Sequence, residues 1–188
     1  MKKILIIVIS LVIVAGLVFG GIKFLNNSSK PAIGYETAED MKAVINSMYE
    51  KAENPLASLE TNEIDISDEM TLASFTGLQS KEGIEKVVVS EPMMTSQAYS
   101  LVLVKTAKDA DVEAIKKEMV DNIDTRKWIC VSAEKLYATN HNELICLVMS
   151  SEELAKPTYE AFKEVVGNKI GKELEKSEEI DMPEDMGY

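Results

Sequence analysis

Residues 84–104 read IEKVVVSEPMMTSQAYSLVLV, and this stretch decides the fold. Two apolar runs, 84–90 and 99–104, are separated by a segment that contains Pro92. Short apolar runs bounded by proline are typical of buried strands, because proline cannot donate to the hydrogen-bond ladder of a central strand. The stretch therefore predicts two strands joined by a loop.

Two helices and two further strands are predicted after this pair. Residues 109–111 carry two aspartates, which favour a helix N-terminus, and apolar residues then recur at helical spacing. Residues 128–137 and 144–149 are the predicted strands, with a turn at 139–142 where asparagine tolerates left-handed backbone. A capping box of Ser150 and Glu153 begins a helix to Val166, with a kink or restart expected at Pro157.

The predicted order over 84–166 is therefore β-β-α-β-β-α. Strand pairs that alternate with helices indicate an α+β fold, and we expect a two-layer sandwich with both helices on one face of the sheet. About 85 residues are enough for one hydrophobic core of this kind.

An amphipathic helix is predicted ahead of this domain, over 38–53. Thr37 and Asp40 form a capping box, and Asn54-Pro55 ends the pattern. The apolar positions are Met41, Val44, Ile45, Met48, Tyr49 and Ala52. This apolar face needs a partner, either the domain behind it or another chain. Residues 56–66 are predicted as loop or short strand, and 68–75 as a short helix ended by Gly77.

The charge is unevenly distributed along the 188 residues. The chain has 32 acidic and 20 basic residues, a formal net charge of −12 and a pI near 4.6. Residues 1–30 contain four lysines and no acid, so the remainder carries 16 bases against 32 acids, or −16. Nucleic-acid binding is disfavoured, because phosphate recognition needs a basic surface.

Residues 4–22 form an uncharged, almost wholly aliphatic run behind Lys2 and Lys3. As a helix this run is roughly 28 Å long, close to the ~30 Å hydrocarbon core of a bilayer. We therefore predict an N-terminal transmembrane helix within residues 1–25, with a cleaved signal peptide as the alternative. A three-residue tail before the span places the large domain outside the cytoplasm, either membrane-anchored through a single pass or secreted after cleavage.

The predicted domain organisation follows from these segments. Residues 1–25 are the anchor or signal, 26–36 a polar linker, 37–79 a helical lead-in, 80–167 the α+β domain and 168–188 an acidic disordered tail.

Few residues in the chain offer catalytic or metal-binding chemistry. His141 is the only histidine, and we expect it in an exposed turn, so a triad that needs an imidazole base is disfavoured. If the turn is centred on 140–141, Cys130 and Cys146 are about five residues out of register, roughly 16 Å apart, too far for a disulfide. We expect two buried thiols on the sheet, with an intermolecular bridge as the alternative. The acidic cluster Glu63, Asp65, Asp68 and Glu69 lacks the spacing of a calcium loop. We predict no catalytic, cofactor or metal site.

Four segments resemble a known family. These are residues 91–94, 100–105, 112–117 and 146–150, with the sequences EPMM, SLVLVK, VEAIKK and CLVMS. They are similar to an uncharacterised family of Gram-positive bacterial proteins, secreted or membrane-anchored, catalogued as a domain of unknown function of the four-three-five-eight type. The resemblance covers about 60–166 and implies an extracytoplasmic location with no assigned activity.

The sequence thus predicts a non-enzymatic module of the cell envelope, held to the membrane by residues 4–22 and binding an envelope protein. No small-molecule substrate is indicated. Two alternatives stay open: a carboxylate-based hydrolase of envelope polymer, with two acids about 5–10 Å apart in one cleft, and a structural subunit whose helix 38–53 pairs with another membrane protein.

Overall fold

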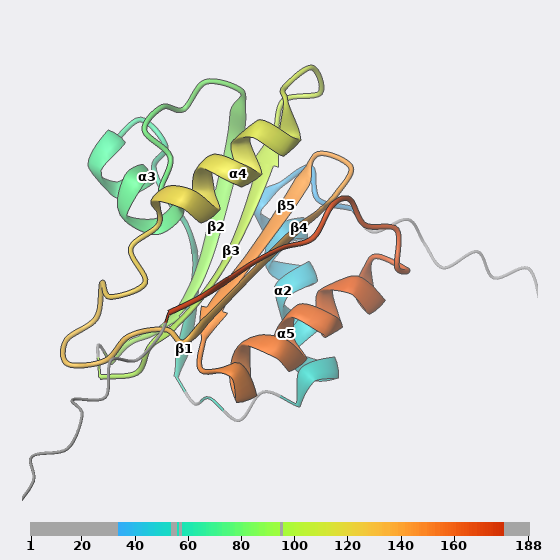
Figure 1. The fold of residues 1–188 in the computed structure, drawn as a ribbon. Coiled ribbons are helices and arrows are strands. Elements are labelled where there is room, and N and C mark those ends of the chain that lie inside the picture. Colours follow the sequence, from blue (N-terminus) through green and yellow to red (C-terminus); the bar gives the residue numbers. More distant parts are fainter. Residues whose placement is uncertain (1–33, 54–55, 57, 95, 179–188) are drawn as a thin grey trace, which may run out of the picture. The chain divides into compact units, whose positions relative to one another are not determined.

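The computed structural model describes residues 34–53, 56, 58–94 and 96–178 (Figure 1). The helices are α2 (Ala38–Ala52), α3 (Glu69–Thr76), α4 (Val112–Asn122) and α5 (Glu152–Val165). The strands are β1 (Leu59–Glu63), β2 (Ile84–Pro92), β3 (Tyr99–Thr106), β4 (Lys135–His141), β5 (Leu144–Ser150) and β6 (Leu174–Ser177). The predicted α+β class is confirmed.

The strands form one antiparallel sheet in the order β1-β2-β3-β5-β4-β6. Strands β3 and β5 lie at its centre, and every residue of both is buried. Their side chains alternate between two cores: Leu101 and Leu103 face one, and Val102 and Val104 face the other. Both faces of the sheet must therefore be covered, since both are apolar.

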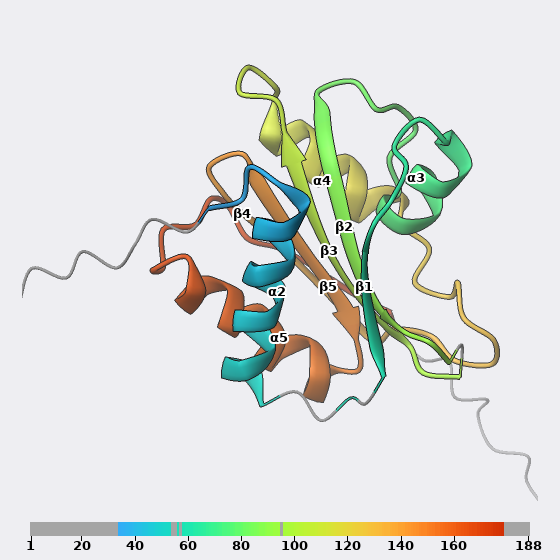
Figure 2. The ribbon, with the colours of Figure 1, turned by 180° about the vertical axis from the view of Figure 1, so that it is seen from behind.

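Helices lie on both faces of the sheet, so the predicted two-layer sandwich is wrong. Figure 2 shows α2 and α5 on one face, with α3 and α4 on the other. Met41, Ile45 and Phe162 pack in the first core, and Leu72 and Met119 in the second. The strand sequences explain this outcome, because continuous apolar runs, unlike alternating ones, present a hydrophobic surface on each side.

Residues 37–79, which we expected to form a lead-in ahead of the domain, pack in the same two cores. The predicted capping box of α2 is confirmed: Thr37 Oγ1 accepts from the backbone N–H of Asp40 at 3.1 Å, and the Asp40 carboxylate accepts from the backbone N–H of Thr37 at 3.1 Å. The buried face of α2 packs on its own sheet, and β1 pairs with β2. The apolar face of helix 38–53 is therefore used within the chain.

The β4–β5 hairpin differs from its prediction in register. The strand predicted over 128–137 begins only at Lys135, after Cys130 takes a left-handed backbone with φ of 63°. The turn comprises Asn142 and Glu143, so Cys146 lies opposite Thr139. Cys146 is buried on the sheet as expected, but the expectation of a second buried thiol is wrong, because Cys130 is exposed and lies outside the sheet; both cysteines are free.

The C-terminal segment is ordered further than predicted. The tail expected to be disordered from 168 on forms β6, which pairs with β4, and residues 179–188 lie outside the described part. Buried Lys116 on α4 fixes this segment: its Nζ donates to the carbonyl of Lys172 at 2.6 Å and to Asn140 Oδ1 at 2.7 Å. Gly171 is required here, since a Cβ would lie 2.2 Å from Asn140 Oδ1.

Helix α5 runs through Pro157 as one element, without the predicted restart. Its N-cap is Ser151, which makes no side-chain capping bond, so the predicted capping box on Ser150 does not form. Among the described residues, no helix has the length and apolar character to cross a membrane. The span predicted at 4–22 lies outside that part of the chain.

Candidate binding surfaces

The sheet has two ends, which carry different side chains. The proximal end holds the start of β2, the end of β3 and the β4–β5 turn, and Tyr35 at the start of the described chain contacts this end. The distal end holds the end of β2 and the starts of β3 and β4. The eight residues of β3 separate the two ends by roughly 25 Å.

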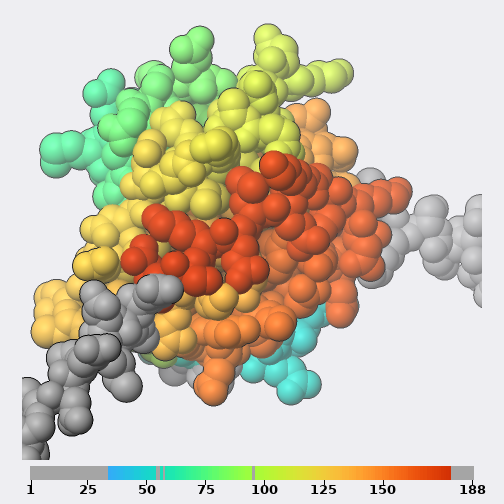
Figure 3. All heavy atoms as spheres, in the orientation of Figure 1, coloured from blue at the N-terminus to red at the C-terminus, as the bar shows by residue number. Residues whose placement is uncertain are grey.

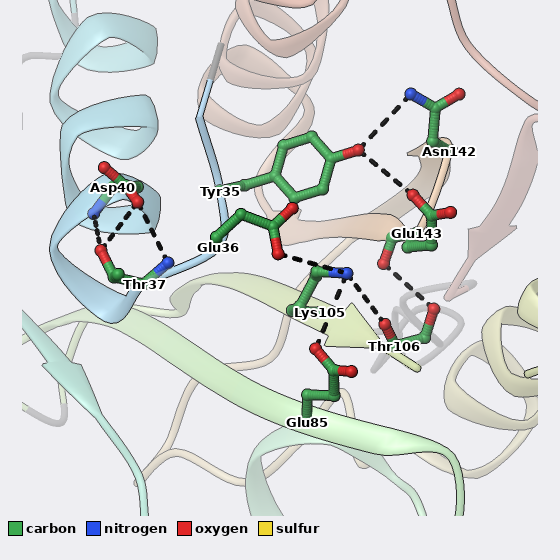
Figure 4. Close-up of polar contacts among 9 residues, drawn as sticks. All are labelled: Tyr35, Glu36, Thr37, Asp40, Glu85, Lys105, Thr106, Asn142 and Glu143. Atoms are coloured by element: carbon green, nitrogen blue, oxygen red, sulfur yellow. Dashed lines mark hydrogen bonds and ion pairs between the residues drawn. The ribbon is translucent and has the colours of Figure 1, made fainter. Parts of the chain in front are cut away.

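A buried lysine organises the proximal end (Figure 4). The side chain of Lys105 is 6% exposed, and its Nζ donates to the carbonyl of Thr106 at 3.2 Å. Glu85 Oε2 lies 3.7 Å and Glu36 Oε2 4.0 Å from this Nζ, and the ring centroid of Tyr35 lies 5.6 Å from it. The ammonium is thus balanced by two carboxylates and covered by an aromatic ring.

Tyr35 ties the segment before α2 to the hairpin turn. Its hydroxyl donates to Glu143 Oε2 at 3.3 Å and accepts from Asn142 Nδ2 at 3.4 Å. Burial raises the pKa of Tyr35. These contacts fix where the chain joins the domain, and we assign them a structural role.

His141 belongs to this end and is not the exposed turn residue that we predicted. It is the last residue of β4 and is half-buried. Nδ1 lies 2.6 Å from the carbonyl oxygen of Lys169, which can only accept, so Nδ1 carries the proton. Nε2 then accepts from Asn142 Nδ2 at 3.3 Å, and the ring meets Tyr35 edge-on. Both ring nitrogens are therefore bonded within the fold.

A half-buried lysine, Lys127, organises the distal end. Nζ of Lys127 contacts Glu91 Oε1 and lies 3.5 Å from Ser100 Oγ. Its distances to the ring centroids of Phe75 and Trp128 are 4.9 and 5.3 Å. Burial lowers the pKa of Lys127, and the Glu91 carboxylate opposes that shift. The ammonium is held between an anion and two aromatic faces.

Exposed apolar side chains follow, in the sequence, the residues that contact this lysine. Met93 and Met94 follow Glu91, and Ile129 follows Trp128; each of these three is about two-thirds exposed. The loops 92–98 and 124–134 that carry them lie side by side at this end of the sheet (Figures 1 and 2). We call Met93, Met94 and Ile129 the distal tip. Residues 91–94 were noticed in the sequence, but Lys127 was not, because no local pattern shows that a loop lysine will meet a strand residue 36 positions earlier.

A groove of about 470 Å³ lies between α5 and β6. Tyr137 and Tyr159 stack in it, with ring centroids 5.2 Å apart. Four carboxylates also line it, from Glu152, Glu160, Glu173 and Glu175, together with Lys156 and Leu174. The hydroxyl of Tyr159 donates to Glu173 Oε2 at 2.6 Å, which lowers the pKa of Glu173.

That pKa direction bears on the hydrolase hypothesis. A paired-carboxylate mechanism needs one acid with a raised pKa, so that it can donate a proton near neutrality. Glu173 shifts the opposite way. The groove brings carboxylates together as the hypothesis requires, but its shifted carboxylate suits attraction of a cation better than proton donation.

The acidic cluster noted in the sequence serves local structure. The Asp65 carboxylate accepts from the hydroxyl and the backbone N–H of Ser67, which lowers its pKa. Asp68 is the N-cap of α3, and its pKa is lowered chiefly by the Thr71 hydroxyl. Within the described ranges no group of three or more histidine, cysteine, aspartate or glutamate side chains is arranged to hold a metal ion.

No protein family model matches the chain, and neither a curated protein nor a solved structure matches it. The resemblance to the Gram-positive family therefore stays a prediction.

Proposed function

We propose that this protein is a membrane-tethered, extracytoplasmic interaction module that binds an envelope protein through the distal tip. One observation carries the proposal: the described chain begins at the proximal end of the sheet, and three exposed apolar side chains, those of the distal tip, lie at the other end. A fourth, Met70, is on α3. In this proposal residues 4–22 serve as the tether and the distal tip meets the protein partner.

The composition of the tip supports protein binding. Exposed apolar side chains that gather at one place indicate an interaction surface. Methionine adapts its shape to a partner, and the half-buried Glu91–Lys127 pair connects the two loops that carry the tip. The partner is expected to offer an apolar surface of its own.

Photo-crosslinking tests the tip directly. Ile129→p-benzoylphenylalanine in the full-length chain should give a discrete adduct in intact cells, and Met93→Ser with Met94→Ser should abolish that adduct. Met70→p-benzoylphenylalanine is the matched control, since Met70 is 82% exposed on α3 and lies outside the tip. Equal adducts from both positions, or an adduct of twice the protein's own mass, would contradict a specific envelope partner.

The chain contains its own probe of location. Cys130 is exposed and Cys146 is buried, so native protein should react with a maleimide at one thiol only. A membrane-impermeant maleimide should label intact cells as fully as lysed cells, and Cys130→Ser should remove the signal. Labelling that requires lysis would place the domain on the cytoplasmic side and overturn the proposed location.

A further inference from the structure

Strand β6 is the last strand of the sheet, and its outer edge is open among the described residues. In the antiparallel pair with β4, alternate residues bond to the neighbour. The backbone N–H of Glu178 donates to the carbonyl of Glu134 at 3.0 Å, which fixes the phase of this alternation. The backbone groups of Glu175 and Ser177 therefore point away from β4, where a further strand could bond to them.

The groove adjoins this edge on the α5 face. Glu175 lies opposite Tyr137 in the β4–β6 register, and both line the groove with Glu173. Figure 3 shows the C-terminal segment at the surface, between α4 in yellow and α5 in orange. A strand added to β6 would place every second side chain over the stacked tyrosines and the carboxylates.

The charge and the aromatic rings of the groove indicate which kind of peptide would bind there. Four glutamates line the groove, and three lysines of the fold, Lys135, Lys156 and Lys163, pair with them. The remaining charge is negative and favours a cationic side chain, which a tyrosine face also attracts. Lys163 shows this preference within the fold, because its Nζ lies 5.4 Å from the ring centroid of Tyr159 and bonds to Glu173. Pairing of β6 with a second copy would bring the glutamates of two chains together, which is unfavourable.

We propose that the β6 edge and the groove together bind an extended basic peptide segment, which adds to the sheet as a seventh strand with lysine or arginine side chains over Tyr137 and Tyr159. This is β-strand addition, in which backbone bonds supply affinity and alternate side chains supply specificity. The site is separate from the distal tip.

The probe is a fluorescent peptide, acetyl-KVKVKVK-amide, titrated into the detergent-solubilised full chain and followed by anisotropy. We expect saturable binding, at least about tenfold tighter than for acetyl-EVEVEVE-amide or for a KVKVKVK peptide with N-methylated alternate amides. Hydrogen exchange should show protection of the Glu175 and Ser177 amides when the peptide is bound. Equal binding of the N-methylated peptide would overturn strand addition.

Two variants separate strand addition from simple charge attraction. Ser177→Pro removes an outward N–H and spares the β4 ladder, so binding should fall about tenfold while the melting temperature changes little. Glu173→Gln with Glu175→Gln should weaken binding similarly. Glu60→Gln with Glu63→Gln is the matched control, because it removes two carboxylates from the opposite edge strand, β1. An equal loss in that control would overturn the site.

Discussion

The two ends of the sheet use the same components for opposite purposes. Each has a lysine beside an aromatic ring and a glutamate: the buried Lys105 with Tyr35 and Glu85, and the half-buried Lys127 with Trp128 and Glu91. At the proximal end the surrounding side chains are charged and fasten the incoming chain. At the distal end they are apolar and exposed. In both places the lysine is a fixed point of the fold. The character of its neighbouring side chains determines whether the surface is used within the chain or can bind a partner.

Lys105→Glu should give the largest effect. It places a third carboxylate against Glu36 and Glu85 at a position that is almost wholly buried. We expect a loss of about 3 kcal/mol in the free energy of unfolding, measured by urea denaturation. Lys105→Met keeps the apolar stem and should cost about 1 kcal/mol. Equal costs for the two variants would show that charge balance is not what secures the proximal end.

Lys127→Met should be milder, at about 1 kcal/mol, because Glu91 retains access to water. Its pH dependence gives the sharper comparison. The folded pKa of Lys127 lies below its ordinary value of 10.5, so the unfolded chain binds the proton more tightly in that range. The stability of the wild type relative to Lys127→Met should therefore rise as the pH increases towards 10.5. A difference that is flat between pH 8 and 10.5 would contradict the desolvated ammonium.

Substitutions in the distal tip should have the smallest effect on stability. Each of the single variants Met93→Ser, Met94→Ser and Ile129→Ser should change the free energy of unfolding by less than about 0.5 kcal/mol. The reason is that the three side chains are mostly exposed. Thermal unfolding checks this, with Met70→Ser as the reference. A larger loss would mean that the tip packs on the fold, and crosslinking results there would need reinterpretation.

The sequence was most informative where local patterns repeat. The runs 84–90 and 99–104 predicted β2 and β3, and the capping pair of Thr37 and Asp40 predicted the start of α2. The same apolar runs also contained the evidence that helices would cover both faces of the sheet. Valine and leucine follow one another in these runs, so neither face of these strands is polar. Local patterns did not show that Cys130 interrupts the strand, because a left-handed residue other than glycine or asparagine has no strong signature.

The candidate surfaces depended on long-range contacts, which explains why the sequence did not predict them. Tyr137 and Tyr159 come together only because β4 pairs with β5 and α5 packs back on both. Glu173 and Glu175 join them through β6, which the acidic composition concealed, because a run rich in glutamate and lysine is typical of a solvated tail.

The place of α2 in the core has a consequence for biosynthesis. This helix is synthesised early, but it packs on β3, β5 and α5, and α5 ends only at Val165. A ribosome must therefore release most of the polypeptide before Met41 and Ile45 can be sheltered. Until then the apolar face of α2 stays exposed to water.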